Sequence, residues 1–208
     1  MHTLYSSPSS PYARKVRVAL HELGATAQVA VRDVDTRDPS TGLWEASPAG
    51  RLPVLVTADG TLVHDSPVIV AWVDATFGHA GARVIPEGPA RWGALTREAT
   101  ADGLLDTLVP WRMEVLRPES ERSPTFLEKS HARGLRILAQ MEREVADPDR
   151  VDVGTIATAC ALGYLEFRFP HVAWRGACPR LAAWYDALAA LPSLRATRPH
   201  NLGEPPPS

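Results

Sequence analysis

Cysteine is scarce in this sequence, and its spacing excludes several kinds of site. The chain has two cysteines, Cys160 and Cys178, and they form no Cys-x-x-Cys pair. This excludes a disulfide-stapled scaffold, a dithiol redox enzyme and a zinc ribbon. The seven histidines contain no His-Glu-x-x-His motif and no pair four residues apart. We therefore expect no metal site.

The chain also lacks a charge excess and a long apolar run. Its formal net charge is −2 and its isoelectric point is about 6.4, whereas a nucleic-acid protein needs a basic face to neutralise phosphates. No window reaches the length of a transmembrane helix. The N-terminus, MHTLYSSP, lacks the basic and apolar regions of a signal peptide. We therefore expect a cytoplasmic protein with no nucleic-acid or membrane partner.

Strand and helix patterns alternate over residues 1–78. Val16, Leu20 and Leu23 share one face of a predicted helix that stops at Gly24. The Asp59-Gly60 pair is a strong hairpin signal. The expected elements are strand 2–6, helix 11–24, strand 27–34, a short helical or irregular piece at 38–46, strands 53–57 and 61–65, and helix 66–77. This order, βαβ, then α, then ββα, predicts a mixed α/β sheet.

The pattern changes at residues 78–90, a stretch rich in Gly and Pro that reads as a linker. Everything after it has helical spacing, and the final residues are Pro-rich and expected to be poorly ordered. The expected helices are 89–116 with a bend at Pro110, 123–145, 152–169 and 179–191. We therefore predict an α/β domain at 1–78, a linker at 79–88 and an all-helical domain at 89–208.

Four separated motifs accompany this layout. They are SSPSSPYARKVRVAL (6–20), SPAGRLPVLV (47–56), HDSPVIVAWV (64–73) and VDVGTIATACALGYL (151–165). Together with the order of elements, they resemble the cytosolic glutathione S-transferases, above all the serine-type bacterial members with tau- or zeta-like features. The resemblance covers nearly the whole chain. It implies a thioredoxin-like first domain, glutathione as co-substrate and a homodimer.

Ser10 and Pro11 read as the cap and first residue of a helix. As a cap alone, Ser10 contributes about 1 kcal/mol, and such caps are common. The resemblance implies a second role, in which the Ser10 hydroxyl donates a hydrogen bond to the glutathione sulfur and favours its thiolate. A helix N-terminus also stabilises a thiolate. Ser9 is the rival hydroxyl, and Ser10 is preferred because similar proteins have the active residue directly before this proline.

The second and third motifs supply the remaining glutathione contacts by resemblance. Pro53 corresponds to a proline that is cis in the family, and the backbone of Leu52 to the group that pairs with the cysteinyl part of glutathione. Arg51 corresponds to a cation near the glycyl carboxylate, although a solvated surface arginine is an equal alternative. Ser66, expected as a helix N-cap before a proline, and Asp65 correspond to the residues that hold the γ-glutamyl end. The fourth motif, with Asp152 as a helix cap, supports only the fold.

The helical domain of such transferases lines the pocket for the electrophile. Asp102 and Asp106 lie four residues apart in an otherwise apolar stripe that we expect to face inward. Either they pair with Arg97, Arg112 or a dimer partner, or they shape that pocket. Trp111, Arg112 and Tyr164 are further candidates for its lining. The full stripe is Leu95, Ala99, Asp102, Asp106, Val109 and Met113.

Two functions follow from the resemblance. The first is a glutathione transferase that attacks a small hydrophobic electrophile or a peroxide, by thiolate stabilisation and positioning, with peroxidase or isomerase chemistry as possible side activities. The second is a transferase-like binding or assembly module with little or no turnover, since a fold does not fix a function. The sequence does not identify the electrophile.

Overall fold

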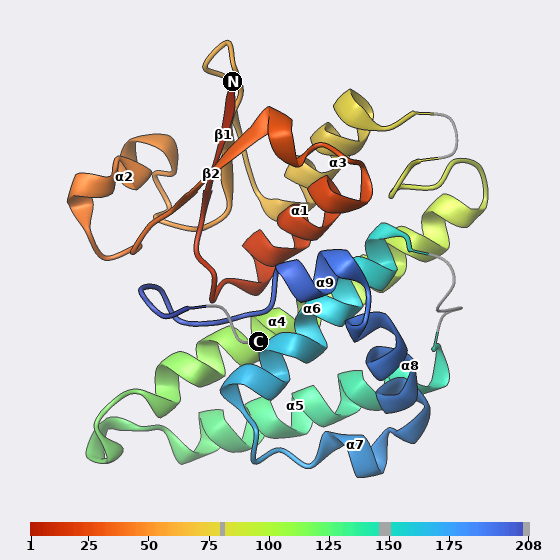
Figure 1. Cartoon of the computed structure of the whole chain (residues 1–208). Coiled ribbons are helices and arrows are strands. Elements are labelled where there is room, and N and C mark those ends of the chain that lie inside the picture. The colour runs from red at the N-terminus through yellow and green to blue at the C-terminus, as the bar shows by residue number, and fades with distance from the viewer. Residues whose placement is uncertain (80–81, 146–150, 206–208) are drawn as a thin grey trace.

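The first half of the molecule is built on a four-stranded sheet. The computed structural model describes residues 1–79, 82–145 and 151–205 (Figure 1). The strands are β1 (His2–Ser6), β2 (Val29–Asp33), β3 (Val54–Val56) and β4 (Leu62–Val63), in the order β2-β1-β3-β4. β1 pairs parallel with β2 and antiparallel with β3, and β3 pairs antiparallel with β4. The sheet is therefore mixed, as the sequence predicts.

Three helices complete this half: α1 (Pro11–Glu22), α2 (Leu43–Ala46) and α3 (Ser66–Phe77). The Ser10 side chain caps α1, and Gly24, at a φ of 64°, takes the left-handed conformation that follows its end. Single 3₁₀ turns lie at Thr26–Gln28 and Pro39–Thr41. The order βαβ–α–ββα around a mixed sheet makes this part a thioredoxin-like domain.

The second half is helical, as predicted. Its helices are α4 (Ala90–Val115), α5 (Pro124–Arg143), α6 (Val153–Arg168), α7 (Trp174–Ala177), α8 (Pro179–Ala189) and α9 (Pro192–Ala196), with a 3₁₀ turn at Glu119–Glu121. Ser123 and Asp152 cap α5 and α6 with their side chains, as the sequence predicts. The short helices α7 and α9 were not predicted. Residues 146–150, which follow the predicted 123–145 helix, lie outside the described residues.

The two halves share one apolar core across the junction. Figure 1 shows α1 between the sheet and the helical half, where it packs against α6. Buried Arg14 of α1 donates to the backbone oxygen of Leu194 at 3.0 Å, which ties α1 to α9. The buried cluster runs from Leu4 in the sheet to Leu104 and Leu162 in the helices. The junction is therefore a packed interface that positions α1 relative to α4 and α6.

The Gly- and Pro-rich stretch expected as a plain linker is tied to both halves. The carboxylate of buried Asp74 in α3 accepts from the backbone nitrogens of Val84 and Ile85, at 2.8 and 3.2 Å. The Val84 oxygen in turn accepts from Val153 at the start of α6, at 2.7 Å. Parts of the tail are also held: the His200 nitrogen donates to the Pro8 oxygen at 3.4 Å. Residues 206–208 lie outside the described ranges.

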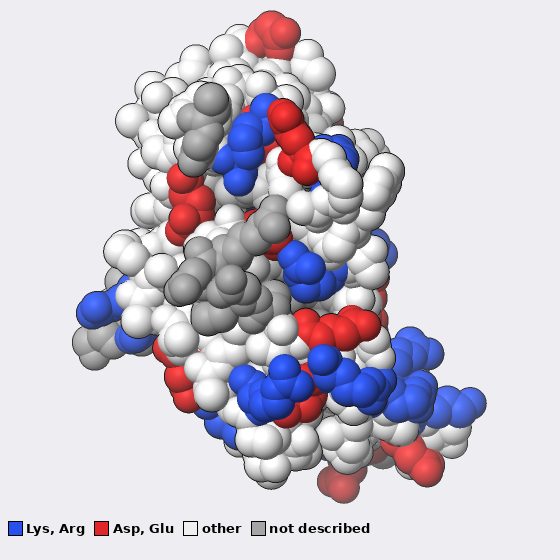
Figure 2. Space-filling view, turned by 90° about the vertical axis from the view of Figure 1, so that its right-hand side faces the viewer, with Lys and Arg blue, Asp and Glu red and all other residues white. Residues whose placement is uncertain are grey.

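Two findings bear on partners and metals. Within the described ranges, no helix has the length and apolar character needed to cross a membrane, and no group of three or more His, Cys, Asp or Glu residues could hold a metal ion. Figure 2 shows acidic and basic side chains interspersed on the face that it presents. That face therefore carries no broad field of one sign.

Candidate functional site

Three of the sequence motifs meet at one edge of the sheet. In the register, Tyr5 lies opposite Val54, so the end of β1 and the start of β3 are neighbours. Val63 lies opposite Leu55, which brings the end of β4 to the same edge. The segments that follow or precede these strand ends are therefore adjacent: Ser7–Ser10, Leu52-Pro53 and His64-Asp65. Neighbouring antiparallel strands run in opposite directions, so the end of one strand lies beside the start of the next. This arrangement brings the three segments together.

Ser10 caps α1 and keeps its hydroxyl proton available. Its Oγ accepts a hydrogen bond from the Ala13 backbone nitrogen at 3.2 Å, and its own nitrogen donates to the Ser7 oxygen at 3.0 Å. Within the described residues, the Ser10 hydroxyl hydrogen has no acceptor. The Ser9 hydroxyl, by contrast, is 3.2 Å from the Ser7 hydroxyl. Capping uses a lone pair of Ser10 and leaves its O–H free to donate, so the two roles are compatible.

The peptide between Leu52 and Pro53 is cis, as the resemblance implies. Pro53 is buried directly before β3, and Leu52 is half-buried at the site edge. Arg51 is exposed, and its backbone nitrogen donates to the Ser47 hydroxyl at 3.2 Å. The side chain of Arg51 is therefore at the surface, within reach of solvent.

The start of α3 corrects one expectation. Asp65, not Ser66, is the N-cap residue, and Ser66 is the first helical residue with Pro67 after it. The Asp65 side chain makes no capping hydrogen bond. Ser66 is 2% exposed, whereas Asp65 is exposed. The free backbone amides at the N-terminus of this twelve-residue helix can bind an anion.

A buried ion cluster joins α1 to α4 below this edge. The Nζ of Lys15, which is 1% exposed, lies 2.7 Å from Asp102 and 3.0 Å from Glu98. Burial raises the pKa of both carboxyls, and the nearby Lys15 charge opposes the rise. The Asp65 charge also raises the pKa of both carboxyls. Two carboxylates, from Glu98 and Asp102, therefore contact one buried ammonium.

The arginine partners expected for Asp102 and Asp106 were wrong. Asp102 pairs with Lys15, while Arg97 pairs at 2.6 Å with Asp152, the cap of α6. Asp106 accepts a hydrogen bond from the Tyr12 hydroxyl across the junction between the halves. Sequence reasoning failed here because both true partners come from α1, about ninety residues earlier in the chain.

Tyr12 lies in α1 and Tyr164 in α6, two helices that pack against each other. Burial and the bond to Asp106 raise the pKa of Tyr12. Burial also raises the pKa of Tyr164, whereas the charges of Arg168 and Arg112 oppose that rise. Tyr12 and Tyr164 are close enough to interact electrostatically, and so are Tyr164 and the two arginines. Tyr164 lies in α6 and Arg112 in α4, so both belong to the helical half.

Trp111 does not join this group. It is buried, and its ring packs against Phe169 at 4.5 Å between centroids and against His131 of α5 at 5.7 Å. Trp111 therefore belongs to the interior of the helical half, on the α5 side of α4.

The expected inward stripe of α4 was also misplaced. Ala99, Asp106 and Met113 of that stripe are exposed. The buried face of α4 carries instead Ala94, Glu98, Ala101, Leu104, Leu105 and Leu108. The helix is rotated relative to the expectation because this second face is the more continuously apolar one and packs against α6.

Sequence reasoning missed Tyr12 and Lys15. Tyr12 stands two residues after Ser10 in the same motif, which could have marked it. Lys15 is one of two lysines in a chain whose other basic residues are arginine, and that rarity could have marked it too. Both cysteines are buried, and burial raises the pKa of Cys160 to about 11 and also raises that of Cys178. Neither thiol is thus poised as a nucleophile.

Comparisons with known proteins agree with this geometry. A family model described as glutathione S-transferase, N-terminal domain, matches residues 4–82, and one described as glutathione S-transferase, C-terminal domain, matches residues 124–187. The uncharacterized GST-like protein YibF of Escherichia coli K12 is 30% identical over 201 residues, which cover 94% of this chain and 98% of YibF.

Solved structures extend the match to bound ligands. A glutathione transferase family member from Pseudomonas fluorescens Pf-5 with bound glutathione is 39% identical, with a TM-score of 0.89 over 96% of this chain and all of the other. A second structure, from the same organism and with bound S-(propanoic acid)-glutathione, is also 39% identical, with a TM-score of 0.86 and the same coverage. The sheet, the helical half, both domain matches and the full-length relatives lead to one conclusion: this chain belongs to the glutathione S-transferase family.

Proposed function

We propose that this chain is a serine-type glutathione transferase, in which Ser10 stabilises the glutathione thiolate for attack on a small hydrophobic electrophile. The observation that carries the proposal is the convergence of Ser10, Leu52-Pro53 and Asp65 at one edge of the sheet. A hydroxyl with a free proton faces this edge at the N-terminus of α1. Family relatives with glutathione or a glutathione conjugate bound support the choice of ligand.

The free energies of these interactions are large enough for Ser10 and the start of α1 to stabilise a thiolate. A hydrogen bond to a charged group contributes about 1.5–3 kcal/mol, and the helix terminus adds about 0.3–1 kcal/mol. At about 1.4 kcal/mol for each pKa unit, the two effects lower the pKa of a bound thiol by about one to three units. This raises the thiolate fraction near neutral pH. The sulfur then attacks an electrophilic carbon, a C–S bond forms, and the leaving group departs with its electron pair.

Glutathione spans the three segments in this proposal. The backbone of Leu52 pairs with the cysteinyl part, and Arg51 lies toward the glycyl carboxylate. The γ-glutamyl carboxylate binds the free amides at the start of α3, while the exposed Asp65 carboxylate takes the γ-glutamyl ammonium group. Burial of Ser66 and exposure of Asp65 fit this division, since of these two side chains only that of Asp65 reaches solvent.

The electrophile lies on the helical side of Ser10. Tyr12, Asp106, Tyr164 and Arg112 line its site, and Asp102 positions α4 through Lys15 rather than touching substrate. The propanoic acid group on the sulfur of the relative's ligand supports conjugation of small organic groups at this position.

We also propose the domain limits 1–78 and 89–208 and a cytoplasmic homodimer. Two large apolar side chains support the dimer: Val68 on α3 is 51% exposed, and Trp92 in the first turn of α4 is 69% exposed. Light scattering after gel filtration tests it with Trp92→Glu, for which a monomer is expected. An unchanged dimer in this variant would exclude Trp92 from the interface.

The function is tested in two steps that separate binding from turnover. Wild type is passed over immobilised glutathione and then assayed for conjugation of chlorodinitrobenzene, beside Ser10→Ala and Ser9→Ala. Retention with conjugation that falls at least about tenfold in Ser10→Ala supports the proposal. Retention without any conjugation supports instead a binding module. Failure to bind glutathione overturns both.

A further inference from the structure

The chain that follows α9 passes beside the turn that carries Ser10. Figure 1 shows this segment in dark blue, running below the connection between β1 and α1. We call residues 197–201 the C-terminal strap. The His200 nitrogen of the strap donates to the backbone oxygen of buried Pro8 at 3.4 Å. Pro8 lies two residues before Ser10, so the strap holds the turn of residues 7–10 on its N-terminal side.

A buried arginine holds the start of the strap from the other side of Ser10. Arg14 lies one helical turn after Ser10 in α1 and is 5% exposed. Its Nε donates to the Thr197 hydroxyl at 3.4 Å, and its Nη2 donates to the Leu194 backbone oxygen at 3.0 Å. The Thr197 hydroxyl itself donates to the Ser193 oxygen at 2.8 Å. Arg14 therefore fixes the end of α9 and the start of the strap to α1.

The surroundings of Arg14 make these contacts costly to lose. Within the described residues no carboxylate forms a salt bridge with Arg14, and the oxygens of Leu194, Thr197 and Tyr185 meet its buried charge. The Leu194 oxygen belongs to the last turn of α9, where backbone oxygens lack an intrahelical donor. Moving α9 away from α1 would leave a buried charge without these acceptors, which is unfavourable.

The two contacts bracket Ser10. Pro8 and Arg14 stand on either side of it in the chain, and residues 194–200 bind both. The turn, the first turn of α1, Arg14 and the strap thus form a closed ring. This ring restricts the backbone of residues 8–14 and with it the position of the Ser10 hydroxyl. A misplacement of about 1 Å at a reacting centre can lower a rate about 100-fold, so such a restriction matters for catalysis.

We propose that Arg14 and the backbone N–H of His200 position Ser10, by holding the C-terminal strap against the turn of residues 7–10. Neither group touches glutathione, and both act through the placement of the Ser10 hydroxyl. The inference rests on the proposed function, because the position of Ser10 matters only if Ser10 acts on the thiol. It gives the end of the chain a part in activating glutathione.

One pair of variants tests the contact with Pro8. His200→Pro removes the backbone N–H that donates to the Pro8 oxygen, because proline has no such group. His200→Ala is the matched control, since it removes the same side chain and keeps the N–H. The two variants therefore differ in the hydrogen bond at issue.

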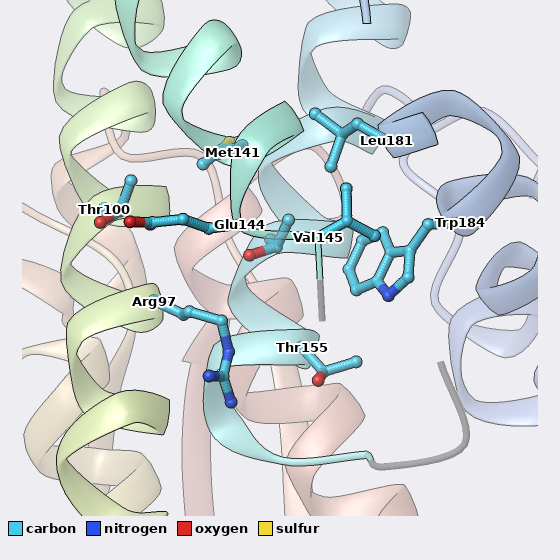
Figure 3. A pocket seen from close by; sticks show the side chains of 9 residues that line it. Arg97, Thr100, Met141, Glu144, Val145, Thr155, Leu181 and Trp184 are labelled. Carbon is cyan, nitrogen blue, oxygen red and sulfur yellow. The ribbon is translucent and has the colours of Figure 1, made fainter. Parts of the chain in front are cut away.

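A second pair tests the contact made by Arg14. Arg14→Met removes the donors to Leu194 and Thr197. Arg97→Met is the matched control, because it also removes an arginine that joins two helices. Figure 3 shows Arg97 extending from α4 toward the start of α6 in the wall of a small pocket, and its salt bridge is made with Asp152, at 2.6 Å. Arg97→Met therefore weakens the helical half without releasing the strap.

Two measurements on the whole protein separate positioning from general stability. Hydrogen exchange of the Ser10 amide, which donates to the Ser7 oxygen at 3.0 Å, reports how often the turn opens. The pKa of the thiol of bound glutathione, followed by ultraviolet absorbance, reports whether the Ser10 hydroxyl is in place. Exchange should become about two- to tenfold faster in His200→Pro and in Arg14→Met, as expected for one lost hydrogen bond. The thiol pKa should move back toward that of free glutathione in both variants.

His200→Ala and Arg97→Met should match wild type in both measurements. Equal results for His200→Pro and His200→Ala would overturn the proposal, and so would equal results for Arg14→Met and Arg97→Met. If Arg14→Met does not fold, the His200 pair decides. A thiol pKa that wild type does not lower would overturn the proposed function and this inference with it. A thiol pKa that wild type lowers and His200→Pro leaves unchanged would overturn this inference alone.

Discussion

The ammonium group of Lys15 on α1 lies 2.7 Å from a carboxylate oxygen of Asp102 on α4. This ion pair joins the helix that begins at Ser10 to the helical half, and Glu98 completes it from one turn away, also at hydrogen-bond distance. The position of α1, and hence of Ser10, relative to the helical half thus depends on a buried charge cluster.

Removing the Lys15 charge should be costly. Lys15→Met leaves two carboxylates without a counter-ion in a buried site, and breaking a buried pair from one side costs about 3–5 kcal/mol. Urea unfolding measures the loss. Lys129→Met on α5 removes the only other lysine from an exposed position and should change the free energy of unfolding by less than about 0.5 kcal/mol. Equal effects of the two variants would show that the cluster contributes nothing.

The cluster also predicts a pH dependence. Burial raises the pKa of Glu98 in the folded state, so the fold binds this proton more tightly than the unfolded chain does. The contribution of Glu98 to stability is therefore present at low pH and lost as pH rises through the raised pKa. Glu98→Gln cannot ionise, so its stability relative to wild type should improve from pH 4 to pH 7. For Glu128→Gln, at an exposed position, the stability relative to wild type should stay constant over this pH range. If the relative stability of Glu98→Gln falls as pH rises, the prediction is contradicted.

Tyr12 and Asp106 bridge the two halves beside Ser10. Tyr12→Phe removes the hydroxyl and should lower the free energy of unfolding by about 0.5–1.5 kcal/mol. If Tyr12 also lines the electrophile site, KM for the electrophile rises while KM for glutathione changes little. Tyr5→Phe is the matched control, because its hydroxyl contacts exposed Arg32 in the sheet. A rise in KM for glutathione alone would assign Tyr12 to the other substrate.

Close packing of α6 on α4 makes a further prediction. A Cβ on Gly154 would lie 2.6 Å from the Ala94 backbone oxygen and 2.7 Å from the Arg97 Cβ, and the backbone cannot yield easily. Gly154→Ala should destabilise the protein by about 1–3 kcal/mol. A Cβ on Gly103 in α4 meets nothing within 4 Å, so Gly103→Ala should stabilise by about 0.5–1 kcal/mol. Thermal unfolding of both variants tests this prediction. If Gly154→Ala stabilised the protein, the close approach of α6 to α4 at Gly154 would be refuted.

Local signals in the sequence were enough for most of the fold. The Ser10-Pro11 and Ser123-Pro124 pairs mark helix starts, and the Asp59-Gly60 pair marks the hairpin, because each acts within a few residues of chain. The sequence did not predict the short helices α7 and α9, because four or five residues are too few to show a helical period.

The site was harder to predict where it depends on distant contacts. The register brings the ends of three strands together, which the order of elements implies. The partners of Asp102 and Asp106 depend on how α1 packs against α4, and no local pattern encodes that contact. The cap of α3 was misplaced by one residue, since Ser-Pro pairs occur both at the cap and at the first helical turn.

The most direct test of the account is the pKa of the glutathione thiol when it is bound. Ultraviolet absorbance of the thiolate, followed against pH, gives this value for wild type, Ser10→Ala and Ser9→Ala. The account predicts that wild type lowers the thiol pKa by about one to three units, that Ser9→Ala retains this shift, and that Ser10→Ala loses most of it. A bound thiol whose pKa is the same in wild type and Ser10→Ala would contradict the role of Ser10.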